Sequence, residues 1–386
     1  MASIKKFGRV EGIYFASIVI LALVGLFSPT SYNVLPAGPI LEGILALCAV
    51  LILRTPKREM ILPLMMATAY VVVSFILMSA YQPSNYLDFA QAFKAFIYII
   101  PLCFFFKRDI FQRDQALIVL KILILAFAIK YAYSIALNIT PRMGTRPGLL
   151  IENNFELIFL LIYFFVLHRD FGRKLTPWFL AVSFIILISG SRSSALALIV
   201  VFCGIYLKNL NTKTVFYVAG LAVLGSFSAT IFLSRGYASG GLESIDRFRF
   251  MLVFIHEIRD WTALNYIFGS FPITALSPES CRSLSFYDVL FSYSGNGSCY
   301  SVILHSYFFR VIFDHGAFGL VLLFSFLAVA LRKYGYSKMD VGVVIGILSA
   351  SALSVSAMNS VFVTLAIALA IGLRKPTALA HQPGKI

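Results

Sequence analysis

An arginine stands in a short polar break between two apolar runs of this sequence. The break covers residues 189–194, reads SGSRSS, and is too short for a true loop, which is typical of a tight turn or a broken helix. Hydroxyl groups and a glycine can satisfy an interrupted backbone, whereas a guanidinium at membrane depth costs free energy unless it meets a partner. Arg192 is therefore a candidate for binding an anionic ligand. The alternative is a structural ion pair.

A second pair of arginines opens an amphipathic stretch that runs to Trp261. Arg247 and Arg249 stand two residues apart in the segment 246–251. On a helix their side chains would diverge by about 200° and could not both face one ligand. We expect Arg249 to face the site, and keep Arg247 as the alternative.

The third segment begins with a histidine, at the start of a long apolar run. His305 is followed by Tyr307 and Arg310, and Gly316 stands eleven residues after it. An imidazole can take a proton from a sugar hydroxyl near neutral pH. We predict His305 as a catalytic base, with Tyr307 and Arg310 binding substrate. A helix-capping or core histidine is the alternative.

Membrane-spanning helices must position these segments. The chain has 386 residues, of which 60% are hydrophobic and 13% charged, far more apolar side chains than one water-soluble core could bury. Largely uncharged runs of about 17 to 23 residues recur, long enough to cross the hydrocarbon core as helices. We predict an all-α polytopic bundle forming a single integral membrane domain over residues 1–386. The expected transmembrane helices, about twelve in number, are 12–28, 37–53, 60–80, 89–106, 115–137, 151–167, 176–190, 194–207, 214–234, 303–331, 339–357 and 359–373.

Lysine and arginine gather in alternate connections, which the positive-inside rule places in the cytoplasm. The clusters lie within 5–9, 54–58, 107–113, 169–174, 208–213, 332–338 and 374–375. Both termini are then cytoplasmic, and the first apolar run is a retained helix, because no small-residue cleavage site follows it. This topology accounts for most of the formal charge of +15, so no nucleic-acid partner is inferred.

The longest connection, 235–303, then lies on the periplasmic side between the ninth and tenth helices, and we expect it to carry part of the active site. Arg142 and Arg146, in the outer segment 138–150, are predicted to bind substrate. All basic residues placed on or near this face are arginines: Arg142, Arg146, Arg192, Arg235, Arg247, Arg249, Arg259, Arg282 and Arg310. A planar guanidinium suits phosphate or carboxylate oxygens. Interfacial or paired arginines are the alternative.

Two cysteines belong to this outer connection. Cys281 and Cys299 could form a disulfide in an oxidising compartment, closing a loop worth roughly 3 kcal/mol; two buried thiols are the alternative. The bridged stretch is rich in Tyr, Phe, Ser and Gly, which suits sugar stacking or, more commonly, a membrane-interface belt. Because histidines and carboxylates of the outer face lack metal-ligand spacing, we expect no metal and no cofactor.

Together these motifs resemble the superfamily of O-antigen ligases and Wzy-type polysaccharide polymerases. The resemblance rests on the Ser-Arg turn, the arginine opening a large outer segment, and the spacing from His305 to Gly316, over residues 140–320. It departs where the family has an aliphatic residue or Trp about four positions after the loop arginine. Met251 or Val253 there leaves the register between Arg247 and Arg249 open.

What the resemblance implies is an inverting, metal-independent glycosyltransferase of the GT-C type in the bacterial inner membrane, using an undecaprenyl-diphosphate-linked oligosaccharide. Arginines would hold the diphosphate, with Arg192 at the Ser-Arg position and Arg249 or Arg247 at the loop position, and His305 would activate the acceptor hydroxyl. The implied partners are membrane lipid and a chain-length regulator and flippase of the same pathway. We favour a polymerase, with a ligase that uses lipid A core as the alternative.

A lipid-linked oligosaccharide flippase or other transporter is the alternative from another class. Such proteins concentrate charge at mid-membrane and often have two related halves. Lys94, Lys121, Lys130 and Glu156 are candidates for intramembrane charge, but no repeat relates the halves of the sequence. A scaffolding subunit of an export complex is a third possibility.

Overall fold

The computed structural model describes residues 8–29, 33–82, 84–137, 139, 147–151, 153–207, 246–353 and 357–374, together with 220, 222, 225 and 226. Within these residues the protein is helical, apart from a single isolated bridge between Phe111 and Leu373. An all-α fold was expected from the composition, and the structure confirms it.

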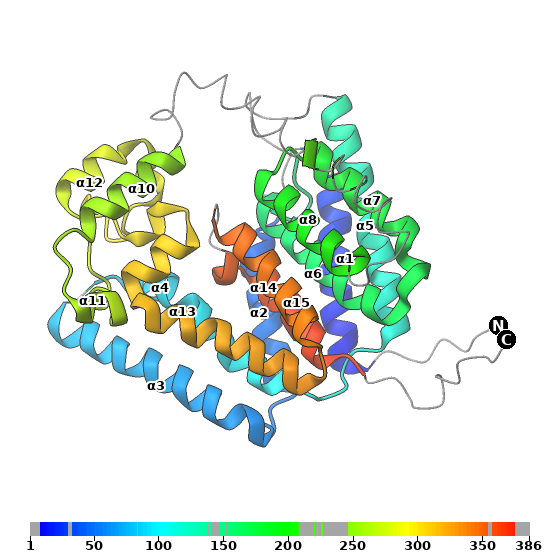
Figure 1. The fold of residues 1–386 in the computed structure, drawn as a ribbon, viewed down its shortest axis with the longest axis horizontal. Coiled ribbons are helices and arrows are strands. Elements are labelled where there is room, and N and C mark those ends of the chain that lie inside the picture. Colours follow the sequence, from blue (N-terminus) through cyan, green and yellow to red (C-terminus); the bar gives the residue numbers. More distant parts are fainter. Residues whose placement is uncertain are drawn as a thin grey trace.

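Long apolar helices form the main bundle (Figure 1). Those before residue 208 are α1 (Arg9–Phe27), α2 (Ala37–Leu51), α3 (Arg58–Tyr81), α4 (Tyr86–Phe105), α5 (Arg113–Ala136), α6 (Asn153–Phe171), α7 (Thr176–Ile188) and α8 (Arg192–Tyr206). Those after residue 306 are α13 (Tyr307–Tyr334), α14 (Lys338–Ala352) and α15 (Val361–Gly372). Each expected span coincides with one of these helices except 214–234, which lies mostly outside the described residues.

Six helical runs in the described part of the chain are long and apolar enough to cross a membrane. They are α1, α3, α4, α5, α13 and the run Asn154–Ile188, which joins α6 to α7. Shorter apolar helices include α2, α8 and α15. The chain is therefore a helical membrane protein.

The centre of the bundle is α15, which is apolar on all sides. All twelve of its residues are buried, as expected for a helix without a polar face. It packs on α6, α4 and α2. Ser360 caps its first turn by accepting a hydrogen bond from the Phe362 amide at 3.2 Å. A buried helix in this position fixes the other elements around it.

Residues 246–304 form a lobe beside the bundle (Figure 1). It contains α10 (Asp246–Glu257), α11 (Ala263–Phe268), α12 (Pro278–Ser283) and the 3-10 helices η3 (Ser285–Leu290) and η4 (Ser301–Leu304). The lobe has its own apolar core, which includes Phe250, Leu276, Leu284, Ile303 and Phe313. Phe313 belongs to α13, so the long helix joins the lobe to the bundle.

Candidate functional site

The Ser-Arg turn is a sharp connection held by serine hydroxyls. Gly190 adopts a φ of +63°, and Ser191 begins α8 by accepting a hydrogen bond from the Ser194 amide at 3.3 Å. The Ser191 hydroxyl donates to Asn154 Oδ1 of α6 at 2.7 Å and lies 2.8 Å from Ser194 Oγ. Ser191, Ser194 and Asn154 are buried. This network ties the start of α8 to α6.

Arg192 is the first residue of α8, and its side chain is half-buried. The amino end of a helix carries about half a positive charge, so a guanidinium at this position adds to the field instead of cancelling it. A cation there is electrostatically unfavourable unless an anion balances both charges. An anionic ligand at this position would be electrostatically favourable, and its binding by Arg192 stays a prediction.

His305 occupies the junction between η4 and α13 in a left-handed backbone conformation. Its φ is +50° and its ψ −23°. Non-glycine residues visit this region uncommonly, and such strain persists where the surrounding structure imposes it. Two neighbouring rings provide part of that structure: Tyr287 lies 4.9 Å and Phe250 5.3 Å from the imidazole, between ring centroids, and the two rings also contact each other. The half-buried imidazole is thus held in one orientation.

Arg249 belongs to the same aromatic cluster. Its guanidinium lies over the Phe286 ring, 5.4 Å from the centroid, and Phe286 lies 4.8 Å from Tyr287. Phe250, the next residue along α10, contacts the His305 ring. Arg249 is exposed, and its guanidinium is linked to His305 through the rings of Phe286 and Tyr287.

Arg247 lies on the same helix as Arg249, because α10 begins at Asp246. The Arg247 side chain lies outside the described part of the structure. The choice of Arg249 over Arg247 as the loop arginine therefore stays a prediction.

The register of α8 on α14 relates Arg192 to His305. A Cβ added at Gly346 would meet Val200, and one added at Gly204 would meet Val343, so the two helices are antiparallel. Arg192 is eight residues before Val200, about 12 Å along α8. This places it beside the last turn of α14, which ends at Ala352.

The last turn of α14 also contacts the start of α13. The Ser306 hydroxyl donates to the Ala352 carbonyl at 3.4 Å, and Ser306 directly follows His305. Arg192 and His305 consequently lie at the same end of α14. Two candidate residues 113 positions apart (305 − 192) are brought to one side of the bundle by helix packing.

Tyr307 and Arg310 lie deeper than we expected for substrate-binding residues. Both are buried, and Arg310 donates from its Nη2 to the Gln91 carbonyl of α4. Asp314 is one turn further along α13 and accepts a hydrogen bond from the Ser301 hydroxyl. Arg310 therefore connects α13 to α4, and Tyr307 belongs to the buried core of the bundle. Their contact with substrate stays a prediction.

A buried histidine beneath this layer has a structural role that spacing could not reveal. His315 Nε2 lies 3.1 Å from the Ala92 carbonyl, and Nδ1 lies 2.9 Å from the Tyr70 hydroxyl. Because a carbonyl oxygen only accepts, Nε2 carries a proton, and in the neutral imidazole Nδ1 accepts from Tyr70. His315 thus joins α3, α4 and α13.

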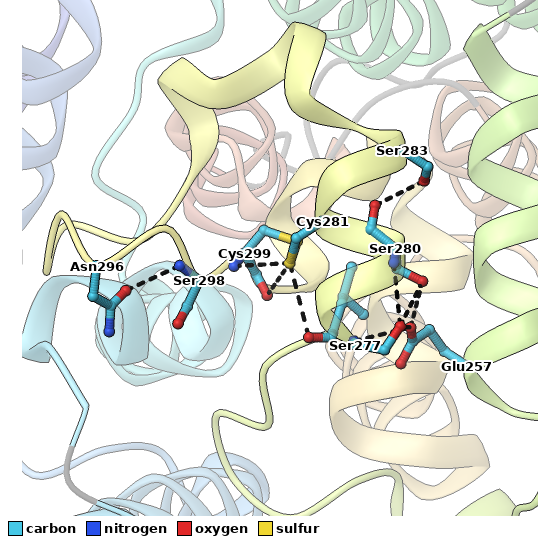
Figure 2. The surroundings of a disulfide bond; sticks show 9 residues. Glu257, Ser277, Ser280, Cys281, Ser283, Asn296, Ser298 and Cys299 are labelled. Atoms are coloured by element: carbon cyan, nitrogen blue, oxygen red, sulfur yellow. Dashed lines mark hydrogen bonds between the residues drawn. A yellow bond between two sulfur atoms is a disulfide. The ribbon is translucent and has the colours of Figure 1, made fainter.

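The lobe side of the site is fastened by a disulfide between Cys281 and Cys299, the pair expected from the sequence. Figure 2 shows Glu257 beside it, with one carboxylate oxygen accepting from the Ser277 amide at 3.0 Å and from the Ser277 and Ser280 hydroxyls. Tyr287, which contacts His305, lies within the bridged segment. The disulfide and Glu257 therefore hold the segment that orients the imidazole.

Arg142 and Arg146 lie outside the described residues. The chain that follows them is firmly anchored, because the buried Glu156 carboxylate accepts hydrogen bonds from the amides of 149–151 and from the Tyr131 hydroxyl at 2.6 Å. Sequence reasoning named Glu156 only as an intramembrane charge. Its role as an anchor depends on backbone amides, which no residue pattern displays.

Comparisons with protein-family models, with curated proteins and with solved structures found no match to this chain.

Proposed function

We propose that this protein is a membrane glycosyltransferase that transfers an undecaprenyl-diphosphate-linked oligosaccharide onto another lipid-linked repeat unit at the periplasmic face. The observation that carries the proposal is the position of Arg192 and His305 at one end of α14, with Arg249 in the aromatic cluster around the imidazole. Guanidinium groups and a base at one mouth of a helical bundle suit an anionic glycosyl donor and a hydroxyl acceptor.

The chemistry requires few groups. His305 takes the proton of the acceptor hydroxyl as its oxygen attacks the anomeric carbon. The bond from that carbon to the diphosphate oxygen breaks with inversion, and undecaprenyl diphosphate leaves with the electron pair. Arg192 and Arg249 balance the charge that grows on the leaving diphosphate. Since diphosphate is already a good leaving group, the reaction needs no metal and no cofactor.

The proposed topology has about twelve spans, both termini in the cytoplasm and the lobe 246–304 in the periplasm of a bacterial inner membrane. It is supported by the alternation of basic clusters along the chain. Partners would be the lipid-linked substrate, surrounding lipid, and a chain-length regulator and flippase of the same pathway. Transfer to lipid A core, as in a ligase, is the second acceptor that the site could serve.

The lysines that could have indicated a transporter interact with other groups of the protein. Lys94 forms an ion pair with Glu42 at 2.5 Å, Lys121 lies over the Trp178 ring, and Lys130 donates to the Ser28 carbonyl at 2.8 Å. Side chains engaged in this way support a rigid bundle. A transporter would need some of them to face a substrate path.

Reconstitution with a defined undecaprenyl-diphosphate oligosaccharide, with products sized on a gel, tests the proposal. A ladder is expected for a polymerase, and one addition to supplied lipid A core would identify a ligase. No reaction with either acceptor would overturn the enzymatic proposal and favour a flippase. Chelation should leave the rate unchanged, and restoration of lost activity by divalent ions would contradict metal independence.

Replacement of His305 by alanine should lower the rate of glycan joining about 10²–10⁴-fold, the contribution of a general base. The matched control is His256→Ala, which removes an exposed imidazole of α10. Both variants should insert and purify as the parent does. A near-normal rate for His305→Ala would remove this residue from the proposed mechanism.

A further inference from the structure

One stretch of the lobe is entirely uncharged. Residues 261–278, between Asp260 and Glu279, contain no acidic, basic or histidine side chain, and they include α11. Large apolar side chains in this stretch remain uncovered, among them Leu264 at 67%, Tyr266 at 47%, Ile267 at 46%, Phe268 at 56% and Phe271 at 41% relative exposure. A contiguous apolar surface of this kind marks a contact with lipid or with another protein.

Packing on α13 shows how deep this stretch lies. Gly316 is nine residues beyond Tyr307, about 14 Å along the helix from its first residue. The Gly316 φ is +62°, and a Cβ at this position would lie 2.4 Å from the Ile267 carbonyl oxygen. Backbone therefore meets backbone here, and the end of α11 is fixed well below the start of α13.

Packing near α3 gives a second measure of the same depth. The Phe271 ring contacts the ring of Tyr81, the last residue of α3, with 6.3 Å between the ring centroids. The Phe268 ring contacts the Phe318 ring, with 5.9 Å between centroids, and the Phe318 ring contacts the Tyr70 ring. Tyr70 lies eleven residues before Tyr81, about 16 Å along α3. From Phe271 to Phe268 the segment thus descends along these membrane-spanning helices, as α11 beside α3 in Figure 1 illustrates.

Several backbone groups of this segment have hydrogen-bond partners within the protein. Thr262 and Asn265 form a capping box at the start of α11, and the Gly269 amide donates to the Asn265 carbonyl at 2.7 Å. The Ser270 amide donates to the Phe313 carbonyl at 2.7 Å. Non-helical backbone is tolerated at membrane depth only where such partners exist.

We propose that residues 262–271 re-enter the membrane and that the exposed apolar face of α11 lies among the acyl chains of the outer leaflet. The uncovered side chains continue the exposed apolar surface of α3, which includes Leu62, Met65, Val72, Val73, Ile76 and Tyr81. Since α3 is a membrane-spanning helix with most of its surface exposed, the lipid that covers it also reaches α11. The lobe is thereby anchored at a fixed depth beside the site.

Depth-dependent fluorescence quenching tests this placement without any need for catalytic activity. The full-length protein carrying Trp178→Phe and Trp261→Phe receives one reporter, Phe268→Trp, and is reconstituted in phosphatidylcholine vesicles with acyl chains brominated at defined carbons. The matched control carries Val289→Trp instead, on the bridged segment where Val289 is 85% exposed. We expect brominated lipid to remove more than about half of the fluorescence of the Phe268→Trp protein and little from the Val289→Trp protein.

Two outcomes would overturn the re-entrant placement. Quenching of the Phe268→Trp reporter by aqueous acrylamide but not by brominated lipid would place α11 in water. Protection from both quenchers would mean that a second copy of the chain, or another protein, covers α11. Failure of the glycan-joining assay would leave this experiment unaffected, so the two proposals can fail separately.

Discussion

The two halves of the candidate site are built in different ways. Around Arg192, a local network of serine hydroxyls buried in the bundle shapes the turn, and the arginine emerges from a helix end. Around His305, the rings of Phe250 in α10 and Tyr287 in η3 contact the imidazole, and a disulfide closes the segment that contains η3. The arginine half is held by hydrogen bonds among buried serines and Asn154 of α6, the histidine half by aromatic contacts and a covalent cross-link.

This difference suggests that the two halves bind different substrates. A diphosphate needs charge at a fixed place, which a helix end in a packed bundle can provide. An acceptor sugar needs room to enter, and the lobe presents exposed groups such as Arg249 and Phe286 beside the base. We infer that the bundle half holds the donor and the lobe half receives the acceptor.

Removing the positive charge of Arg192 should have the largest effect on activity and is the strongest test of the difference between the two halves. Arg192→Ala should lower the rate about 10²–10³-fold, because a preorganised donor to the leaving group is lost. Arg192→Lys should recover only part of that rate, since an ammonium cannot reproduce the bidentate fork. Initial rates of glycan joining at saturating donor measure both. Wild-type activity of Arg192→Ala would assign donor binding elsewhere.

Opening the disulfide should loosen the lobe half and leave the bundle half intact. The Cys281→Ser, Cys299→Ser double variant loses roughly 3 kcal/mol of loop-closure stabilisation. Because Tyr287 lies within the bridged segment, the rate of glycan joining should fall while donor affinity is kept. Proteolysis of the lobe and donor titration measure the two effects.

The control for this variant is Cys203→Ser, which changes a free cysteine of α8. It should leave both the protease resistance of the lobe and the rate unchanged. If the double variant loses donor affinity as strongly as rate, the two halves are not separate in function.

Removing Ser191, which caps the first turn of α8, should have a smaller effect on stability and donor binding. Ser191→Ala removes the hydroxyl that accepts from the Ser194 amide and donates to Asn154, at a cost of about 1 kcal/mol. The midpoint of thermal unfolding in detergent should fall by a few degrees, and donor affinity should weaken slightly. Ser17→Ala, which loses only a bond to the Ile13 carbonyl within its own helix, should be close to neutral. Equal effects in both variants would argue against a special role for the turn.

Local patterns in the sequence determined most of the secondary structure. Uninterrupted apolar runs of this length placed the helices, because a helix satisfies its backbone hydrogen bonds in lipid within a single segment. The SGSRSS segment predicted a turn at the start of α8, and the two outer cysteines predicted their pairing. The helices and the turn depend on residues that are close in sequence. The disulfide was predictable because the outer connection has only two cysteines.

Tertiary packing alone decided which candidate residues come together. The antiparallel register of α8 on α14 brings Arg192 to the end where His305 lies, and the aromatic cluster around His305 includes Phe286, which Arg249 contacts. Packing also buries Arg310 and Tyr307, which we predicted to bind substrate. Helical periodicity states which residues share a face, but only the neighbouring helices determine whether that face meets substrate, lipid or protein.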